Sequence, residues 1–292
     1  TAAARWGHNT TGLALTNLDA FRNDRDNEGV MDPAYDGTDV SKLIWSSNYI
    51  FEIFDTTSGS PVHKTYLNDL QSAVDYVYNN TTKNNMSFEI RLLRSSNEVT
   101  STINFKTKRS SNYNQNITFT SAEGQNYSLV RGANFTGTMF NITSNGSGSN
   151  RNFTLRFGRI TLDGASKQNS EPLVNVNYSS ATLYLGYDNN NIDVPVFKNN
   201  YTTGNGGAIS VTSVSNFTIY NCDIYGNQAS QSGGGVYVNY ESGSGTFSAK
   251  SNTLNLYGGF VHDNKAGNSG GGIYFSGWSL LRFLLCNRMS IK

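Results

Sequence analysis

One pattern recurs three times between residues 197 and 275, and it limits the fold more than any other feature of the chain. The copies are FKNNYTTGNGGAISV at 197–211, IYGNQASQSGGGVYV at 224–238 and VHDNKAGNSGGGIYF at 261–275. Each has an apolar residue, two variable residues, Asn, five variable residues, Gly-Gly, Ala or Gly, and then Ile or Val. A repeat this short, built from strands without a helix, cannot bury a core alone. The copies must therefore stack, which predicts a parallel β-helix.

The Asn and Gly positions of the repeat are interpreted as corners of the stacked chain. Asn tolerates the left-handed backbone region, and its amide can bond to the same amide in the next copy. Glycine suits a corner that needs positive φ or a close approach of two backbones. These structural corners are Asn200, Gly206, Gly207, Asn227, Gly233, Gly234, Asn264, Gly270 and Gly271.

The apolar positions of the repeat predict the core. They are expected to point inward and to form continuous stacks, with successive strands about 4.8 Å apart. The residues concerned are Phe197, Ile209, Ile219, Ile224, Val236, Leu254, Leu256, Val261 and Ile273. The interval between the second and third copies is longer than the first, and residues 239–252 are interpreted as an inserted loop.

The rest of the chain divides by its hydrophobic period. From Phe88 onward, apolar residues alternate in short runs separated by Gly, Asn and Ser, so the predicted β-helix spans 81–292, with an atypical apolar and basic tail at 278–292. Apolar residues at helical spacing predict an amphipathic helix over 65–80, with Thr65 as N-cap, that caps the exposed end of the stack. Residues 1–64 form an N-terminal region to which no fold is assigned, although YIFEIF at 49–54 resembles a strand.

The repeat also resembles a known family. The pairing of Phe-x-x-Asn at 197–200 with Gly-Gly-Ala-Ile at 206–209 resembles the repeat of the polymorphic outer-membrane proteins, and TLNLYGGFVHDNKAGNSGGGIY at 253–274 is similar to β-helical repeats of large bacterial surface adhesins. The resemblance covers about 197–275. It implies an all-β fold, a right-handed single-stranded parallel β-helix (solenoid), located extracellularly or at the cell surface and used in attachment.

Charge and cysteine content narrow the class of partner. Lys plus Arg number 22 against 21 Asp plus Glu, so no net field favours nucleic acid. Cys222 and Cys286 form neither a disulfide framework nor a metal motif. No apolar run reaches membrane-spanning length, so no membrane span is expected in this chain. Because it opens with TAAARW, without Met, the chain is expected to be a piece of a longer product.

The variable residues between the corners are the candidates for binding or catalysis. The Gly-rich steps lack the Gly-Lys-Ser/Thr ending of a phosphate loop, and no cofactor is expected. Alignment of the copies places Lys198, Tyr225 and His262 in one outward column and Asn199, Gly226 and Asp263 in the next. These columns contain one carboxylate, since Asp163, Asp188, Asp193 and Asp223 show no shared register, and His262 is interpreted as a surface side chain rather than a catalyst.

Two further candidates lie outside the columns. Asp24, Asp26 and Glu28 imitate the start of a calcium loop, but the twelfth position holds Tyr35 instead of Glu. This is a weak calcium candidate, and no metal site is predicted. Outward tyrosines, among them Tyr184, Tyr220 and Tyr257, could stack on sugars or be routine strand residues.

The sequence therefore favours a non-catalytic, adhesin-like β-helix that presents loops, above all 239–252, to a host or environmental glycan or protein surface. The alternatives are a pectin lyase-like enzyme, that is a polysaccharide lyase or glycoside hydrolase on the same scaffold, and a purely structural spacer.

Overall fold

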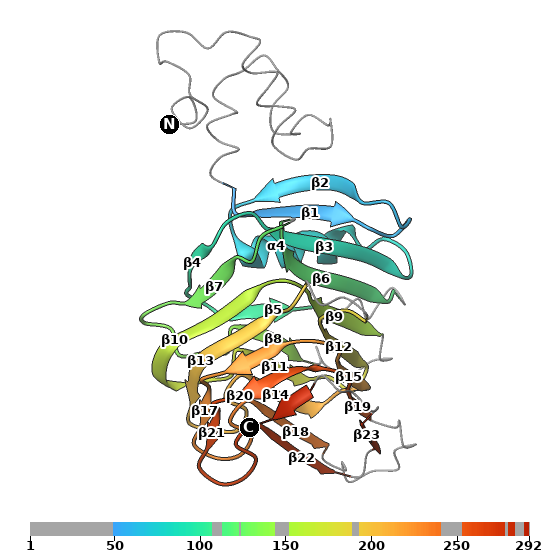
Figure 1. Cartoon of the computed structure of the whole chain (residues 1–292). Coiled ribbons are helices and arrows are strands. Elements are labelled where there is room, and N and C mark those ends of the chain that lie inside the picture. Colours follow the sequence, from blue (N-terminus) through green and yellow to red (C-terminus); the bar gives the residue numbers. More distant parts are fainter. Residues whose placement is uncertain are drawn as a thin grey trace, which may run out of the picture.

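A computed structural model describes residues 49–106, 113–122, 124–143, 152–188, 193–240, 253–277, 280–283 and 289–291. The fold is mostly β, with three long sheets (Figure 1). The calcium candidate Asp24, Asp26 and Glu28, and residues 241–252 of the expected loop, lie outside the described residues.

The first sheet contains nine strands in the order β2-β1-β3-β6-β9-β12-β15-β19-β23. From β3 onward every pair in it is parallel, whereas β1 pairs antiparallel with both β2 and β3. Its strands are β1 (Phe51–Asp55), β2 (Val62–Leu67), β3 (Met86–Leu92), β6 (Gln115–Ser121), β9 (Phe153–Phe157), β12 (Ala181–Leu185), β15 (Asn216–Ile219), β19 (Thr253–Leu256) and β23 (Leu280–Phe283).

The second and third sheets are parallel throughout, in the orders β24-β20-β16-β13-β10-β7-β4 and β22-β18-β14-β11-β8-β5. The second contains β4 (Ser96–Val99), β7 (Ser128–Arg131), β10 (Thr161–Ser170), β13 (Val196–Thr202), β16 (Asp223–Tyr225), β20 (Gly259–His262) and β24 (Met289–Ile291), with the two-residue strands β17 (Gln228–Ala229) and β21 (Lys265–Ala266) beside it. The third contains β5 (Ile103–Phe105), β8 (Phe140–Thr143), β11 (Val174–Asn177), β14 (Ile209–Ser213), β18 (Val236–Tyr240) and β22 (Ile273–Gly277).

The chain visits the three sheets in turn. β9, β10 and β11 belong to the first, second and third sheets, and β12, β13 and β14 repeat that order one layer further along. The strands accordingly succeed one another from β2 at the top of Figure 1 to β22 and β23 at the bottom. Stacking of the copies, inferred from the repeat, is confirmed by the register, because Phe197, Ile224 and Val261 pair in sequence across β13, β16 and β20.

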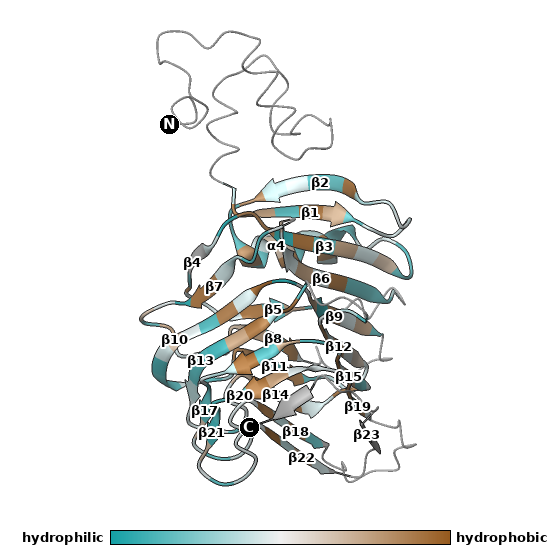
Figure 2. Ribbon diagram, in the orientation of Figure 1, coloured by the Kyte–Doolittle hydropathy of each residue, from teal (hydrophilic) through white to brown (hydrophobic). Residues whose placement is uncertain are grey.

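The core follows the alternation of apolar and polar residues along the strands (Figure 2). Eight of the nine residues expected to point inward are at most 3% exposed, and Ile273, in the last layer of the third sheet, is partly buried. Phe119, Phe140, Phe157 and Phe197 form a chain of edge-to-face contacts with centroids 5.4–5.5 Å apart. Such contacts add stability beyond the area that the rings bury.

The single helix among the described residues, α4, spans Leu70–Asn80. The expected helix over 65–80 is therefore wrong at its N-terminal end, where Thr65 belongs to strand β2 instead of capping the helix. Asp69 is the N-cap, because its carboxylate accepts the backbone N–H of Ser72 at 2.7 Å. The apolar face is as expected, since Leu70, Ala73, Val74 and Val77 are buried.

Candidate functional site

The asparagine corners connect consecutive layers through their side chains. Asn227 Oδ1 accepts the backbone N–H of Asn200 at 3.1 Å, and Asn264 Oδ1 accepts the backbone N–H of Asn227 at 3.0 Å. Asn227 Nδ2 also donates to Asn264 Oδ1 at 3.0 Å. An amide–amide bond thus joins one pair as expected, whereas an amide–backbone bond joins the other. These side chains are structural, because their polar atoms bond within the protein.

The repeated asparagines Asn200, Asn227 and Asn264 do not have left-handed backbone, which corrects the interpretation of the corner. Positive φ occurs one position earlier, at Asn199 (54°), Gly226 (64°) and Asp263 (52°). The left-handed residue turns the chain, and the Asn that follows can then direct its amide along the stack. The first glycine of each Gly-Gly pair in the repeat does have positive φ, between 68° and 72°. These glycines are Gly206, Gly233 and Gly270.

A buried arginine, which the sequence reasoning missed, begins the asparagine column. Arg131 is 1% exposed and donates through Nε to Asn200 Oδ1 at 3.2 Å, and through its other nitrogens to the carbonyls of Gly137 and Glu171. Burial lowers the pKa of its guanidinium to about 10, so Arg131 remains charged at neutral pH. Each of its three nitrogens donates to a protein acceptor, so Arg131 has a structural role.

The outward column of the second sheet contains Asp163, Lys198, Tyr225 and His262 in register. The alignment of Lys198, Tyr225 and His262 is confirmed. Asp163 was wrongly excluded: it pairs with Lys198 in register and forms an ion pair with it at 3.3 Å. The Tyr225 and His262 rings stack at 5.2 Å with an interplanar angle of 7°. Neighbouring side chains in this column therefore contact one another, by an ion pair in one case and by ring stacking in the other.

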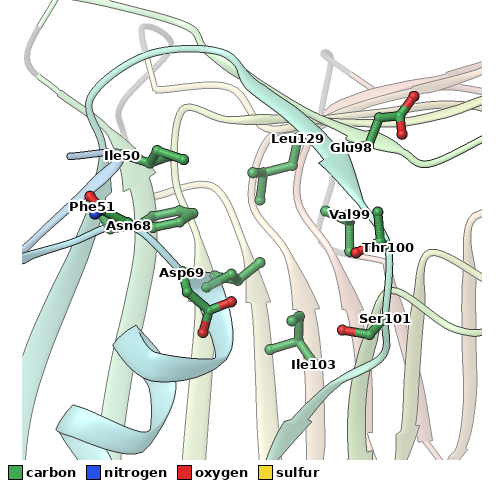
Figure 3. Close-up of a pocket in the computed structure, with 11 residues that line it drawn as sticks. Ile50, Phe51, Asn68, Asp69, Glu98, Val99, Thr100, Ser101, Ile103 and Leu129 are labelled. Atoms are coloured by element: carbon green, nitrogen blue, oxygen red, sulfur yellow. The ribbon is translucent and has the colours of Figure 1, made fainter. Parts of the chain in front are cut away.

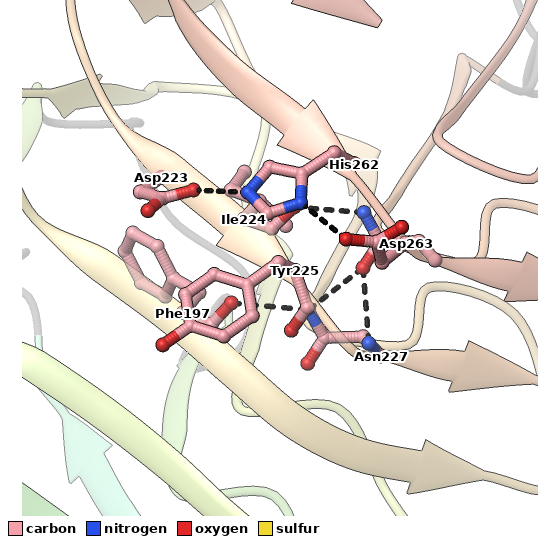
Figure 4. A network of polar contacts seen from close by, with 8 residues as sticks. Phe197, Asp223, Ile224, Tyr225, Asn227, His262 and Asp263 are labelled. Carbon is pink, nitrogen blue, oxygen red and sulfur yellow. Dashed lines mark hydrogen bonds and ion pairs between the residues drawn. The ribbon is translucent and has the colours of Figure 1, made fainter. Parts of the chain in front are cut away.

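Asp223, which lies in register with Val196 and Phe260, contacts this column from two residues away, and the sequence reasoning did not find this contact. Its Oδ1 lies 3.1 Å from His262 Nε2, while His262 Nδ1 lies 2.7 Å from Asp263 Oδ2 (Figure 4). The hydrogen bond that His262 donates to the Asp263 carboxylate and the nearby charge of Asp223 raise the pKa of His262 above its usual value, against the opposing effect of desolvation. Among the described residues, His262 is therefore the best candidate for a general acid or base, because its partly exposed imidazole lies between two carboxylates.

We predict that His262 makes stability depend on pH. Because the pKa of His262 is higher in the folded chain than in the unfolded one, its contribution is complete below about pH 6.5 and is lost as the pH rises through the folded pKa. Thermal unfolding of the wild type and of His262→Gln at about pH 6 and pH 8 tests this. The wild type should lose more stability over that interval, and equal losses would contradict the assignment.

The tyrosines Tyr184, Tyr220 and Tyr257 form a column of stacked rings at the C-terminal ends of the first-sheet strands β12, β15 and β19, although Tyr184 is in register with Thr218. Their rings stack on one another with centroids 5.9 and 5.1 Å apart, at 20° in both cases. The Arg156 guanidinium lies 4.4 Å from the Tyr184 centroid. Because both faces of Tyr220 are covered by its neighbours, this column offers mainly ring edges and hydroxyls, and face-on stacking of a sugar on Tyr220 does not fit.

A pocket of about 300 Å³ lies beside the N-terminus of α4 (Figure 3). Its apolar floor includes Phe51, Val99 and Leu129, and its acidic side chains are Asp69 and Glu98. The Asp69 carboxylate already caps α4, so it is engaged in the fold. The other polar residues that line the pocket are Asn68, Glu98, Thr100 and Ser101.

A second pocket, of about 320 Å³, lies along the third sheet and is mostly polar. Asn175, Ser210 and Tyr237 line it, together with residues at its rim such as Glu171 and Asn205. The sequence reasoning missed this pocket, because it considered the columns of the second sheet and the tyrosines of the first.

Within the described ranges, no group of three His, Cys, Asp or Glu residues could hold a metal ion, and no helix is long and apolar enough to cross a membrane. Cys222 is fully buried and burial raises the pKa of its thiol, so it is unreactive. The chain matches no family model, no curated protein and no solved structure.

Proposed function

We propose that the chain is the stalk or binding surface of an adhesin, a right-handed single-stranded parallel β-helix exposed at a cell surface or secreted. The observation that carries the proposal is the uninterrupted parallel pairing of equivalent strands in three sheets, which the chain visits in turn. Such an arrangement is stiff and elongated, and it presents long outward columns. The likeness of the repeat to the polymorphic outer-membrane proteins and bacterial surface adhesins supports the same role.

The contacts of α4 support its proposed role as the N-terminal cap. Gln71 Oε1 accepts the backbone N–H of Asn104 at 2.9 Å, and Gln71 Nε2 donates to the Asn104 carbonyl at 3.2 Å. Asn104 lies on β5, the outermost strand of the third sheet. One side-chain amide thus occupies backbone groups that a further strand would otherwise pair with, which protects the sheet edge from association.

The outward side chains favour binding over catalysis. Asp163 is paired with Lys198, and Asp223 and Asp263 both contact His262, so the carboxylates in and beside this column are engaged by a cation or by the imidazole. Glycoside hydrolysis in its usual form needs two carboxyl groups with separate acid and base or nucleophile roles. We therefore place a polysaccharide lyase or glycoside hydrolase second, with His262 as its acid–base candidate.

The test combines binding and turnover. The purified chain is incubated with host cells, matrix proteins and a glycan array, and separately with pectins and glycosaminoglycans. We expect binding to at least one surface without release of unsaturated or reducing ends. Product formation that His262→Ala abolishes would establish the enzyme instead.

The loop is tested in the same assay. A variant in which residues 241–252 are replaced by a short Gly-Ser linker should bind less if that loop contributes to recognition, and the wild type should bind more than background. If the chain binds no cell, protein or glycan and releases no product, the remaining interpretation is that it is a purely structural spacer.

A further inference from the structure

The outer face of the third sheet carries a column whose character changes at one residue. Strand pairing places Asn104, Asn141, Asn175, Ser210, Tyr237 and Tyr274 in register from β5 to β22. Asparagines occupy the N-terminal half and tyrosines the C-terminal half. Ser210 is the smallest side chain of the column and lies at the boundary between the two halves.

Each half is ordered by contacts within itself. Asn141 Nδ2 donates to Asn104 Oδ1 at 3.1 Å, and Asn175 Nδ2 donates to Asn141 Oδ1 at 2.9 Å. The Tyr237 and Tyr274 rings stack at 5.2 Å and 5°. A rigid amide row therefore ends at Asn175, and a rigid aromatic pair begins at Tyr237, one layer beyond Ser210.

The polar pocket lies at this boundary. Asn175, Ser210 and Tyr237 all line it, whereas Asn141 and Tyr274 do not. Ser210 is 7% exposed and forms part of the floor. Because its side chain is much smaller than an amide or a phenol ring, it leaves space between the last asparagine and the first tyrosine. The volume of about 320 Å³ is in the range of small-molecule sites.

The pocket has hydrogen-bonding capacity that the fold does not use. Asn175 Nδ2 donates a hydrogen bond to Asn141, and Asn205 Oδ1 accepts one from the backbone N–H of Ser232 at 2.9 Å. In the described part of the chain, the Asn175 Oδ1 acceptor and the Asn205 Nδ2 donor make no hydrogen bond. The hydroxyls of Ser210 and Thr212 add groups that both donate and accept.

The charge of the pocket limits the ligand further. Glu171 is its one ionisable carboxylate, and no Lys, Arg or His is among its lining residues in the described ranges. A carboxylate accepts hydrogen bonds from hydroxyl groups but repels another carboxylate. Neutral polyols are therefore favoured over uronic acids, sulfated sugars and phosphates.

We propose that this pocket binds a neutral saccharide residue, packed against the Tyr237 ring above Ser210 and hydrogen-bonded to Asn175 and Asn205. A ring with an apolar face and a rim of hydroxyls matches an aromatic platform beside fixed amides. The inference rests on the proposed adhesin function and names the glycan class and the site for it.

Two variants test the site from opposite directions. Tyr237→Ala removes the platform. Ser210→Tyr fills the pocket, and the fold should accept it because the next two layers already carry Tyr at this register position. Tyr257→Ala is the matched control, since it removes a stacked tyrosine ring that lies away from the pocket and, within the described residues, does not contact Tyr237. Thermal unfolding confirms that each variant is folded.

Binding is measured on an array of neutral oligosaccharides and their uronic acid counterparts, and affinities for the best neutral glycan are then determined by calorimetry. We expect at least a roughly tenfold loss of affinity for Tyr237→Ala and Ser210→Tyr and less than about a twofold change for Tyr257→Ala. Tighter binding of uronic acids than of neutral sugars would overturn the inference.

The result separates this site from the adhesin function itself. If the wild type binds cells or matrix proteins but no neutral glycan, or if Ser210→Tyr binds glycan like the wild type, the saccharide site is wrong and the adhesin function stands. If the wild type binds nothing at all, both proposals fail.

Discussion

Asn227→Leu is expected to destabilise the chain by about 4 kcal/mol or more, enough to remove most soluble protein from expression at 37 °C. The replacement has nearly the same size, so the loss comes from hydrogen bonds. Asn227 is 1% exposed, and its amide bonds to the Phe197 and Tyr225 carbonyls, to Asn264 Oδ1 and to the backbone N–H of Asn200. Each group left buried without a partner costs about 1–3 kcal/mol.

The matched control is Asn268→Leu, which makes the same change at an exposed Asn whose side chain has no hydrogen bond in the described residues. Denaturant unfolding, with expression yield as a second readout, should show a change within about 0.5 kcal/mol for the control. The double variant Asn227→Leu with Asn264→Leu should give no soluble protein. Wild-type stability of that double variant would show that the asparagine column does not hold the layers together.

The sequence repeats the corner residues because each is dictated by a local requirement. An Asn that bonds to the neighbouring layer, and a Gly where two backbones meet, must recur at the same place in every copy. What it could not supply was the exact shape of the corner. Asn199, Gly226 and Asp263 share the left-handed conformation but differ in residue type. The sequence pattern therefore did not indicate that their backbone conformation is the same.

Outside the three clear copies, prediction failed where the repeat is irregular. Strand β10 contains a register shift between Asp163 and Lys167, with Ala165 and Ser166 at positive φ. This interrupts the spacing, so the alignment of Asp163 with Lys198 was missed. The role of Arg131 was also missed. Its side chain reaches past β10 to Asn200 on β13, and no local motif predicts a contact between residues so far apart in the sequence.

The polar pocket of the third sheet was missed because it depends on which side chains three successive layers place next to one another. Asn175, Ser210 and Tyr237 are separated by insertions of different kinds in the sequence, and none is unusual alone. A pocket arises only because a small residue falls between an amide and a ring in the same column. Such a gap becomes visible once the register is known, whereas the repeat pattern itself concerns the corners.

Gly207→Ala is expected to be about as damaging as the loss of Asn227, for a steric reason. A Cβ on Gly207 would lie 1.8 Å from the Gly234 carbonyl oxygen, and one on Gly234 would lie 2.2 Å from the Gly271 oxygen. Both clashes are with backbone, which cannot rotate away as a side chain can. The two layers would have to separate at this corner, breaking the hydrogen bond from Gly207 N to Gly233 O at 2.9 Å.

Gly271→Ala provides the control at the same position of the repeat. In the third copy the nearest atom to the added Cβ, among the described residues, is the Asn264 carbonyl oxygen at 3.4 Å, an ordinary contact. Gly207→Ala and Gly234→Ala should therefore lose about 3–5 kcal/mol of unfolding free energy, and Gly271→Ala less than about 1 kcal/mol. Calorimetry and denaturant unfolding measure both. Equal losses at all three positions would mean that glycine is required by the conformation of one corner rather than by the layer stacked upon it.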